Sequence, residues 1–186
     1  MRVIKFKEYL IEILNEPTYK YNSSDNNFNY TNIYLGEDAN NYPTSNHGIK
    51  IYQNDSLISN CIILGFGGAT TIHDNSFVID GDNLIICCSN AVFSIQLVDL
   101  KLNWFNTFDI ATCFQIFKIH EDYVIHGELE ITMIDKNGNI KWTFGGEDIF
   151  VSIDNVEEFK IIENTIILTD FSKTQYILDF KGNQIK

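Results

Sequence analysis

From Ile49 to the C-terminus, the chain consists of short apolar runs separated by polar turns. Short runs rich in isoleucine, valine and phenylalanine, bounded by Gly, Asn and Asp, are typical of β-strands. Such strands are joined by tight turns rather than by long helical connections. The pattern therefore predicts an all-β fold over residues 49–186.

The same pattern recurs along the chain. Residues 79–109 and 119–148 each contain an acidic turn, an apolar strand, a polar break, a second strand, a further turn, a tryptophan and a closing acidic residue. Residues 161–186 form a shorter copy, and residues 49–64 a partial one. The irregular spacing is near ~40 residues, which is the length of a four-stranded propeller blade. One such unit cannot bury its apolar face alone, so neighbouring units are expected to stack.

Matched positions support this alignment. Trp104 corresponds to Trp142, and Asp109 corresponds to Glu147 or Asp148. The turn at residues 54–55 similarly corresponds to the turns at 137–138 and 181–182. We interpret the two tryptophans as core residues that hold successive units together.

The turn "KNGNIKW" (136–142), and more loosely "VDLKLNW" (98–104), resembles the turn of quinoprotein-type and tryptophan-docking β-propeller repeats. The stretches "TCF", "HGELEI" and "GNIKW" are also similar to uncharacterised bacterial proteins. The resemblance implies about three to four blade-like antiparallel units in an incomplete or small propeller-like assembly. A β-sandwich is the alternative. The resemblance identifies no cofactor residues, so no cofactor is predicted.

The N-terminal region has a different character. Phe6, Leu10, Ile13 and Leu14 follow helical spacing, which predicts a short amphipathic helix before Pro17. Residues 15–48 are rich in Asn, Ser and Tyr and read as irregular, although residues 28–35 have the composition of one strand. We expect a single domain, 1–186, with this helix and irregular segment in 1–48 and the β repeats in 49–186.

Composition narrows the function classes. The formal net charge of −12 argues against nucleic acid or an anionic membrane as partner and suits a cationic protein. No signal-peptide core or membrane-length apolar run is present, so a cytoplasmic location is expected. The four cysteines lack metal-binding spacing and are expected to be buried thiols. No oligomeric state is predicted.

The stretch "HEDYVIHGELEI" (120–131) is the strongest candidate for a site. In one continuous strand, His126, Glu128 and Glu130 would share a face, because side chains two apart point the same way. Two of them would be close enough to share a zinc ion, but a further ligand would be needed. With no such ligand identified, we predict a partner-binding surface and no metal site. The predicted partner-binding residues are His126, Glu128, Glu130, Asp109, Glu147 and Asp148.

Three functions remain open at this point. A non-catalytic binding protein is favoured, in particular an immunity-type inhibitor steered electrostatically onto a basic toxin or another cationic partner. The first alternative is a metal-dependent hydrolase or lyase that uses the His126, Glu128 and Glu130 face. The second alternative is a module for a small ligand or carbohydrate, with tyrosines of the N-terminal region as stacking platforms: Tyr19, Tyr21, Tyr30, Tyr34 and Tyr42.

Overall fold

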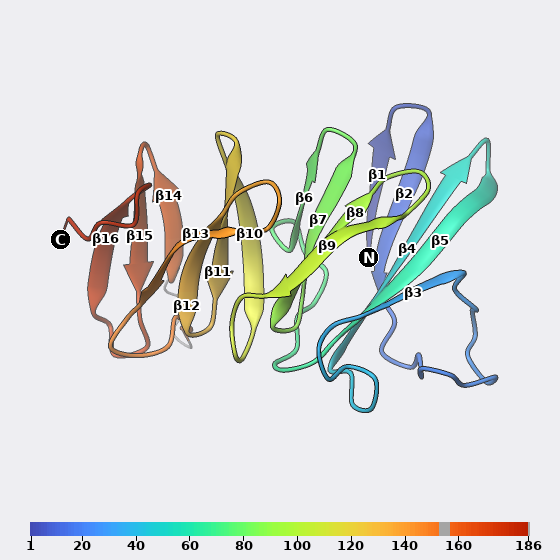
Figure 1. Ribbon diagram of the computed structural model, residues 1–186, viewed down its shortest axis with the longest axis horizontal. Coiled ribbons are helices and arrows are strands. Elements are labelled where there is room, and N and C mark those ends of the chain that lie inside the picture. The colour runs from blue at the N-terminus through green and yellow to red at the C-terminus, as the bar shows by residue number, and fades with distance from the viewer. Residues whose placement is uncertain (153–156, 186) are drawn as a thin grey trace.

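A computed structural model describes residues 1–152 and 157–185. The described chain folds into four small β-sheets, which Figure 1 shows side by side in an open row, with the first and last sheets at opposite ends. The first sheet has the order β1-β2-β4-β5-β3, with bounds Arg2–Phe6, Tyr9–Asn15, Ser45–Gln53, Ser56–Gly65 and Asn32–Leu35. The second contains β6 (Phe77–Asp80), β7 (Asn83–Cys88), β8 (Ala91–Gln96) and β9 (Leu102–Thr107). The third contains β10 (Cys113–Ile119), β11 (Asp122–Gly127), β12 (Glu130–Ile134) and β13 (Ile140–Gly145). The fourth contains β14 (Phe159–Ile162), β15 (Thr165–Thr169) and β16 (Gln175–Asp179).

The prediction of all-β, blade-like antiparallel units is confirmed. Residues 79–109 and 119–148 occupy equivalent strands of the second and third sheets, in which each strand pairs antiparallel with the next along the chain. The row does not close into a ring, because its end sheets lie far apart in Figure 1.

The predicted N-terminal helix is wrong. Residues 2–15 form the β1–β2 hairpin, in which Ile4 pairs with Ile11. Ile11 and Ile13 are fully buried, whereas Leu10 is 41% exposed. The buried positions therefore alternate with period two and do not follow the helical spacing on which the prediction relied.

The irregular segment between β2 and β4 covers the outer face of the first sheet. Tyr19 and Tyr30 are buried against Ile62 and Leu64 of β5. The strand predicted within residues 28–35 is confirmed as β3, which adds to the sheet parallel to β5. The first sheet is thus buried on both faces, by its own chain on one side and by the second sheet on the other.

Three apolar clusters lie between successive sheets. Phe93 and Ile86 of the second sheet pack with Ile49 of the first. Equivalent clusters join the second sheet to the third and the third to the fourth. Each interior sheet is consequently apolar on both faces, as stacking requires.

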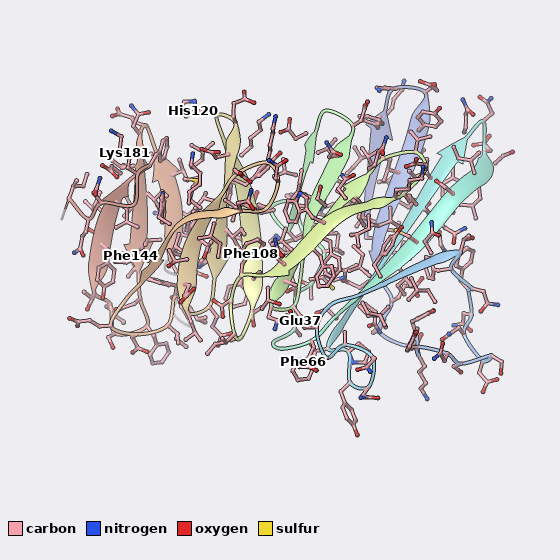
Figure 2. All side chains as sticks on the ribbon, viewed as in Figure 1. Glu37, Phe66, Phe108, His120, Phe144 and Lys181 are labelled. Atoms are coloured by element: carbon pink, nitrogen blue, oxygen red, sulfur yellow. The ribbon has the colours of Figure 1, made fainter. Side chains whose placement is uncertain are left out.

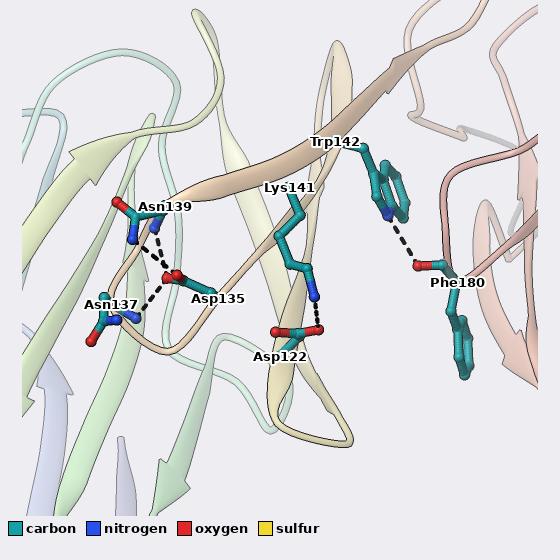
Figure 3. Close-up of polar contacts among 7 residues, drawn as sticks. All are labelled: Asp122, Asp135, Asn137, Asn139, Lys141, Trp142 and Phe180. Atoms are coloured by element: carbon teal, nitrogen blue, oxygen red, sulfur yellow. Dashed lines mark hydrogen bonds and ion pairs between the residues drawn. The ribbon is translucent and has the colours of Figure 1, made fainter.

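A tryptophan of each interior sheet docks onto a turn of the next sheet. Trp104 Nε1 donates to the Lys136 carbonyl at 3.2 Å, and Trp142 Nε1 donates to the Phe180 carbonyl at 3.0 Å (Figure 3). Both rings lie against a turn glycine, since a Cβ built on Gly138 would be 2.9 Å from Trp104 Cδ2, and one on Gly182 would be 2.7 Å from Trp142 Cδ2. The tryptophans link successive units as expected, but the interpretation that they are core residues is wrong, because both are only half-buried.

The receiving turns share the sequence Asp-x-x-Gly-Asn, at 135–139 and 179–183. The Asp135 carboxylate accepts hydrogen bonds from the backbone of Asn137 and Asn139 and from the Asn139 side chain (Figure 3). Asp179 accepts the equivalent three bonds. These bonds, led by the Asn139 and Asn183 side chains, hold the pKa of each aspartate below its ordinary value. The aspartates therefore fix the turn on which the ring rests.

Ser59 occupies the equivalent position in the first sheet, where its hydroxyl donates to the Val98 carbonyl. In the first, second and third sheets, the pairing register of the strand that carries the docking side chain shifts by one residue. The unpaired extra residue immediately precedes that side chain and is Ile58, Asn103 and Lys141, respectively. A β-bulge re-aims the side chain that follows it. The shared bulge thus directs Ser59, Trp104 and Trp142 across to the neighbouring sheet.

Candidate functional site

The three residues of the predicted strand face do not share a face. Strand β11 ends at Gly127, the chain turns at Glu128 and Leu129, and Glu130 opens β12. The prediction of one continuous strand through these residues is wrong. The His126, Glu128 and Glu130 side chains do not converge, so the structure gives no support to the metal-dependent hydrolase alternative.

His126 is a core residue. Its ring stacks on Phe159 with centroids 5.0 Å apart, and its Nε2 lies 3.1 Å from the Phe150 carbonyl. Burial lowers the pKa of His126 to about 4, so the imidazole is neutral near pH 7. A neutral ring donates from one nitrogen only, so Nε2–H serves the Phe150 carbonyl. Nδ1 is then an acceptor 3.2 Å from Gln115 Oε1, and the Gln115 amide donates to it once its NH₂ takes that position. Neither nitrogen is free for a partner.

Asp109 is also buried, and its carboxylate is fully engaged. One oxygen accepts the backbone N–H of Ala111 at 2.7 Å, and the other accepts those of Leu129 and Glu130 at 2.8 and 3.0 Å. Asp109 therefore clamps the linker between the second and third sheets onto the β11–β12 turn. Its role is to position this region, and it has no surface to offer a partner.

The other predicted residues lie on one edge of the molecule, here called the linker edge. This edge lies along the lower side of Figure 1 and consists of the linkers that join successive sheets and of one turn within each of the last three sheets. The linkers are residues 66–70, 108–112 and 146–150, and the turns are residues 89–90, 128–129 and 170–173. Each of the later segments is joined to an earlier one by a backbone hydrogen bond of 2.7–2.8 Å. The N–H groups of Cys113, Glu128, Phe150 and Phe171 donate to the carbonyls of Ser89, Thr112, Glu128 and Ile149, respectively. The edge is thus one continuous hydrogen-bonded surface.

Hydroxyl groups hold two of the carboxylates on this edge. In the described part of the chain, the six ion pairs use Asp74, Asp80, Asp82, Asp99, Asp122 and Glu157. Glu128 instead accepts from the Thr112 hydroxyl, and Asp148 from the Ser172 hydroxyl, a bond that lowers the pKa of Asp148. Glu130 and Glu147 are exposed. This surface is therefore rich in carboxylates.

Ile110 stands out on the linker edge because its side chain is 84% exposed. Its neighbours in sequence are fixed: Asp109 is buried, and the Ala111 carbonyl accepts from Gly68 N at 2.7 Å. A Cβ at Gly67 would come within 2.5 Å of that carbonyl, so glycine is needed here for this close approach. Ile110 is thus an apolar side chain held on a rigid support, and the sequence pattern alone did not single it out.

A shallow hollow of about 230 Å³ lies beside Ile110. Phe108, Leu129 and Ile140 give it apolar walls, and the exposed carboxylate of Glu130 lies at its rim. Figure 2 places Phe108 between the second and third sheets, with Glu37 and Phe66 further along the same edge. An apolar hollow with a carboxylate at its mouth fits a long cationic side chain, whose stem is apolar and whose head is charged.

Other candidate chemistry is limited. Among the residues that the structure describes, no three His, Cys, Asp or Glu side chains come together as a metal site. The four cysteines are buried and free, as predicted. Of the tyrosines proposed as stacking platforms, Tyr19 and Tyr30 are buried, whereas Tyr42 is 77% exposed. No helix in the described ranges has the length and apolar character needed to span a membrane.

Comparisons with known proteins bear on the fold. No protein-family model matches the sequence, and no curated protein matches it. The computationally designed Ika8 protein is similar in structure, with a TM-score of 0.53 and 6% identity over 76% of this chain and 45% of that chain. BamB from Moraxella catarrhalis gives a TM-score of 0.48 and 14% identity over 75% of this chain and 42% of that one, and the designed Ika4 protein gives 0.49 and 7% over 65% and 78%.

This chain spans less than half the length of Ika8 and of BamB. At 6% identity, the likeness to Ika8 concerns the fold alone. It agrees with the propeller-like arrangement of small antiparallel sheets seen here.

Proposed function

We propose that the protein is a non-catalytic binding protein whose linker edge captures a cationic segment of a partner protein. The observation that carries the proposal is the rigidly held, 84% exposed Ile110 next to an apolar hollow with Glu130 at its rim. Ile110, Leu129 and Ile140 line one apolar hollow, and a contiguous apolar patch rimmed by polar groups is typical of a protein–protein contact.

The residues of this site have different roles in the proposed binding. Ile110 and the walls of the hollow would bury the stem of a lysine or arginine, at about 0.8 kcal/mol for each CH₂ removed from water. Glu130 would pair with the charged head. Glu128, Glu147 and Asp148 surround this contact along the edge and would act at longer range, increasing the association rate with a basic partner.

An immunity-type role is the specific form of this function that we favour. Toxins that cleave nucleic acid present basic surfaces, and an acidic inhibitor is drawn onto them. The formal net charge of −12 and the exposed carboxylates of Glu130 and Glu147 on the linker edge support this role.

The chemistry can be tested before any partner is identified. The probe is a fluorescein-labelled peptide of alternating Arg and Leu, and its binding is measured by fluorescence anisotropy at low and high salt. We expect Ile110→Asp and Glu130→Lys each to weaken binding about tenfold or more, by loss of apolar burial or of charge pairing.

Glu121→Lys is the matched control. It makes the same charge change at an exposed turn next to His120, which Figure 2 places on the opposite edge. Equal weakening by Glu121→Lys and Glu130→Lys would show that only net charge matters, and the linker edge would lose its assignment. Absence of a stable complex with the purified product of the neighbouring gene would argue against the immunity role in particular.

A further inference from the structure

A groove of about 590 Å³ opens between the second and third sheets. It lies at the end of the strands away from the linker edge, because Asn83 in its wall begins β7 and the linker-edge turn at residues 89–90 follows the other end of that strand. Trp104, Tyr123 and Ile85 contribute aromatic and apolar surface. We call this space the interlayer groove, and its remaining lining residues are polar: Asp80, Asn83, Ser94, Asn103, Lys136 and Asn137.

The position of Ser94 is apolar in the other sheets. Ser94 pairs with Trp104, and the residue that pairs with the docking side chain is Met133 in the third sheet and Ile51 in the first. Met133 and Ile51 are buried in the apolar clusters that fill the neighbouring interlayer spaces. Ser94 is also buried, with 3% of its surface exposed. A hydroxyl therefore stands at an interior position that is otherwise apolar.

Two further positions show the same difference. Asp80 ends β6, and the corresponding strand ends of the third and first sheets are Ile119 and Phe6, which both pack into apolar clusters. Lys136 supplies the carbonyl that receives the tryptophan, and the equivalent residue of the fourth sheet is Phe180, which packs into an apolar cluster as well. Polar groups at interior positions cost stability. Such departures from the packing of a fold are typical of functional sites.

The polar groups of the groove retain unused hydrogen-bonding capacity. Asn103 Nδ2 donates to Asn83 Oδ1 at 2.8 Å and to Ser94 Oγ at 3.2 Å. These bonds leave the Ser94 hydroxyl proton, Asn103 Oδ1 and Asn83 Nδ2 without a hydrogen-bond partner among the described residues. The groove thus presents donors and acceptors together. A ligand hydroxyl, which both donates and accepts, matches such a set.

Trp104 gives the groove a fixed aromatic wall. Its Nε1 donates to the Lys136 carbonyl at 3.2 Å, and its ring lies against Gly138. Figure 3 shows Asn137, which also lines the groove, on the same turn. An indole that is already held in place loses little freedom on binding, and its apolar face suits the C–H face of a sugar ring.

We propose that the interlayer groove binds a neutral sugar, a hexose or an N-acetylhexosamine, with its C–H face on Trp104 and its hydroxyls on Ser94, Asn83 and Asn103. The volume of the groove falls within the range of about 300–1,000 Å³ that is usual for small-molecule sites. None of the N-terminal tyrosines that the sequence suggested as stacking platforms lines it. The site is separate from the linker edge and does not depend on the partner binding proposed there.

The charges at the groove favour a neutral ligand. The Asp80 carboxylate is already bonded to Lys118 Nζ and to the Tyr123 hydroxyl, both at 2.6 Å. Lys136 is exposed in the groove wall and disfavours a cation. The formal net charge of −12 disfavours an anion.

Fluorescence titration tests the proposal in a Trp142→Phe background, where Trp104 is the only tryptophan. The probes are glucose, galactose, mannose and N-acetylglucosamine, with free lysine and inorganic phosphate as charged comparisons. We expect at least one sugar to change the Trp104 emission saturably, with a dissociation constant on the order of 1 mM, and neither charged probe to do so. Calorimetry on the wild-type chain should give the same constant.

Ser94→Met introduces the side chain that the third sheet carries at this position, so it fills the groove with an apolar group. We expect it to abolish sugar binding, while urea unfolding shows a folded chain at least as stable as the parent. Ser56→Met makes the same change at an exposed position of β5 and is the matched control, which should bind like the parent. Asn103→Ala, at an exposed position, removes both amide bonds and should weaken binding about tenfold.

Absence of binding by all four sugars overturns the proposal, and so does binding of free lysine or phosphate in their place. Unchanged affinity in Ser94→Met also overturns it, as does an equal loss of binding in Ser56→Met. If Ser94→Met does not fold, Asn103→Ala decides, because wild-type affinity in that variant overturns the proposal. Peptide binding at the linker edge should be unchanged in Asn103→Ala, so failure of this inference and failure of the proposed function are distinguishable.

Discussion

Replacing Gly182 by alanine tests the docking of one sheet onto the next. Gly182 has a φ of 83°, and a Cβ at this position would lie 2.7 Å from Cδ2 and Cγ of Trp142. Gly81 provides a matched control, because it also has a positive φ, of 57°, but a Cβ there would meet nothing within 4 Å. The two Gly→Ala changes thus share the backbone strain and differ in the contact with the tryptophan.

The expected magnitudes follow from these contacts. Left-handed backbone costs alanine about 1–2 kcal/mol at either position. At Gly182 the indole must also move, which adds about 1–3 kcal/mol for the overpacking and about 1 kcal/mol for the lost Trp142 Nε1–Phe180 hydrogen bond. We expect Gly182→Ala to lower the free energy of unfolding by about 3–6 kcal/mol and Gly81→Ala by about 1–2 kcal/mol.

Urea unfolding at pH 7 measures both values. A Trp104→Phe background leaves Trp142 as the only tryptophan, and its emission should shift to the red in Gly182→Ala before any unfolding. Equal destabilisation by the two substitutions, with unchanged emission, would refute the docking of Trp142 on this turn.

Two further predictions concern the buried imidazoles and the tryptophan itself. Burial lowers the pKa of His47 and of His126 to about 4, so the unfolded chain binds protons between pH 6.5 and 4 while the folded chain does not. The free energy of unfolding is therefore highest above pH 6.5 and falls as the pH drops, by about 2 kcal/mol for each histidine between pH 8 and 5. His126→Gln should remove about half of this pH dependence, as measured by urea unfolding at each pH. Trp142→Ala should lower the free energy of unfolding by about 2–4 kcal/mol in the same assay, and an unchanged value would mean that the ring contributes little to holding the fourth sheet.

The repeating units were predictable because their turns and tryptophans can be recognised in the sequence itself. Asn137-Gly138 and Lys181-Gly182 mark turns by composition, and Trp104 and Trp142 recur at matched positions of two units. What a tryptophan contacts was not predictable, because its partner is a turn some 32 or 38 residues further along the chain. Ser59 carries no such signal, and only the shared bulge reveals that it is equivalent.

The errors have a common origin in contacts between distant segments. Residues 3–14 fit both a helical and a strand period, and pairing with β4 decides for the strand. The turn after Gly127 contains Glu128 and Leu129, which are not typical turn residues. It is fixed from a distance, because the Thr112 hydroxyl donates to the Glu128 carboxylate and the Leu129 N–H donates to Asp109. His126 was consequently assigned to a polar face when it lies in the core.

The candidate site was predicted only in part. Glu128, Glu130, Glu147 and Asp148 do lie on one edge, but local sequence could not show that this edge is made of linkers joined by hydrogen bonds. Ile110 was overlooked because an isoleucine in a β-rich sequence is expected in the core, and its exposure depends on the path of the linker.

The segment that folds back over the first sheet makes the two ends of the row unequal. Each layer is held chiefly by the layers that touch it, so a layer with one neighbour is the easiest to lose. Among the described residues, both faces of the first sheet are covered, whereas the fourth sheet packs against the third on one face. Fraying of an isolated molecule therefore has a direction: it starts at the C-terminal layer and proceeds towards the N-terminus.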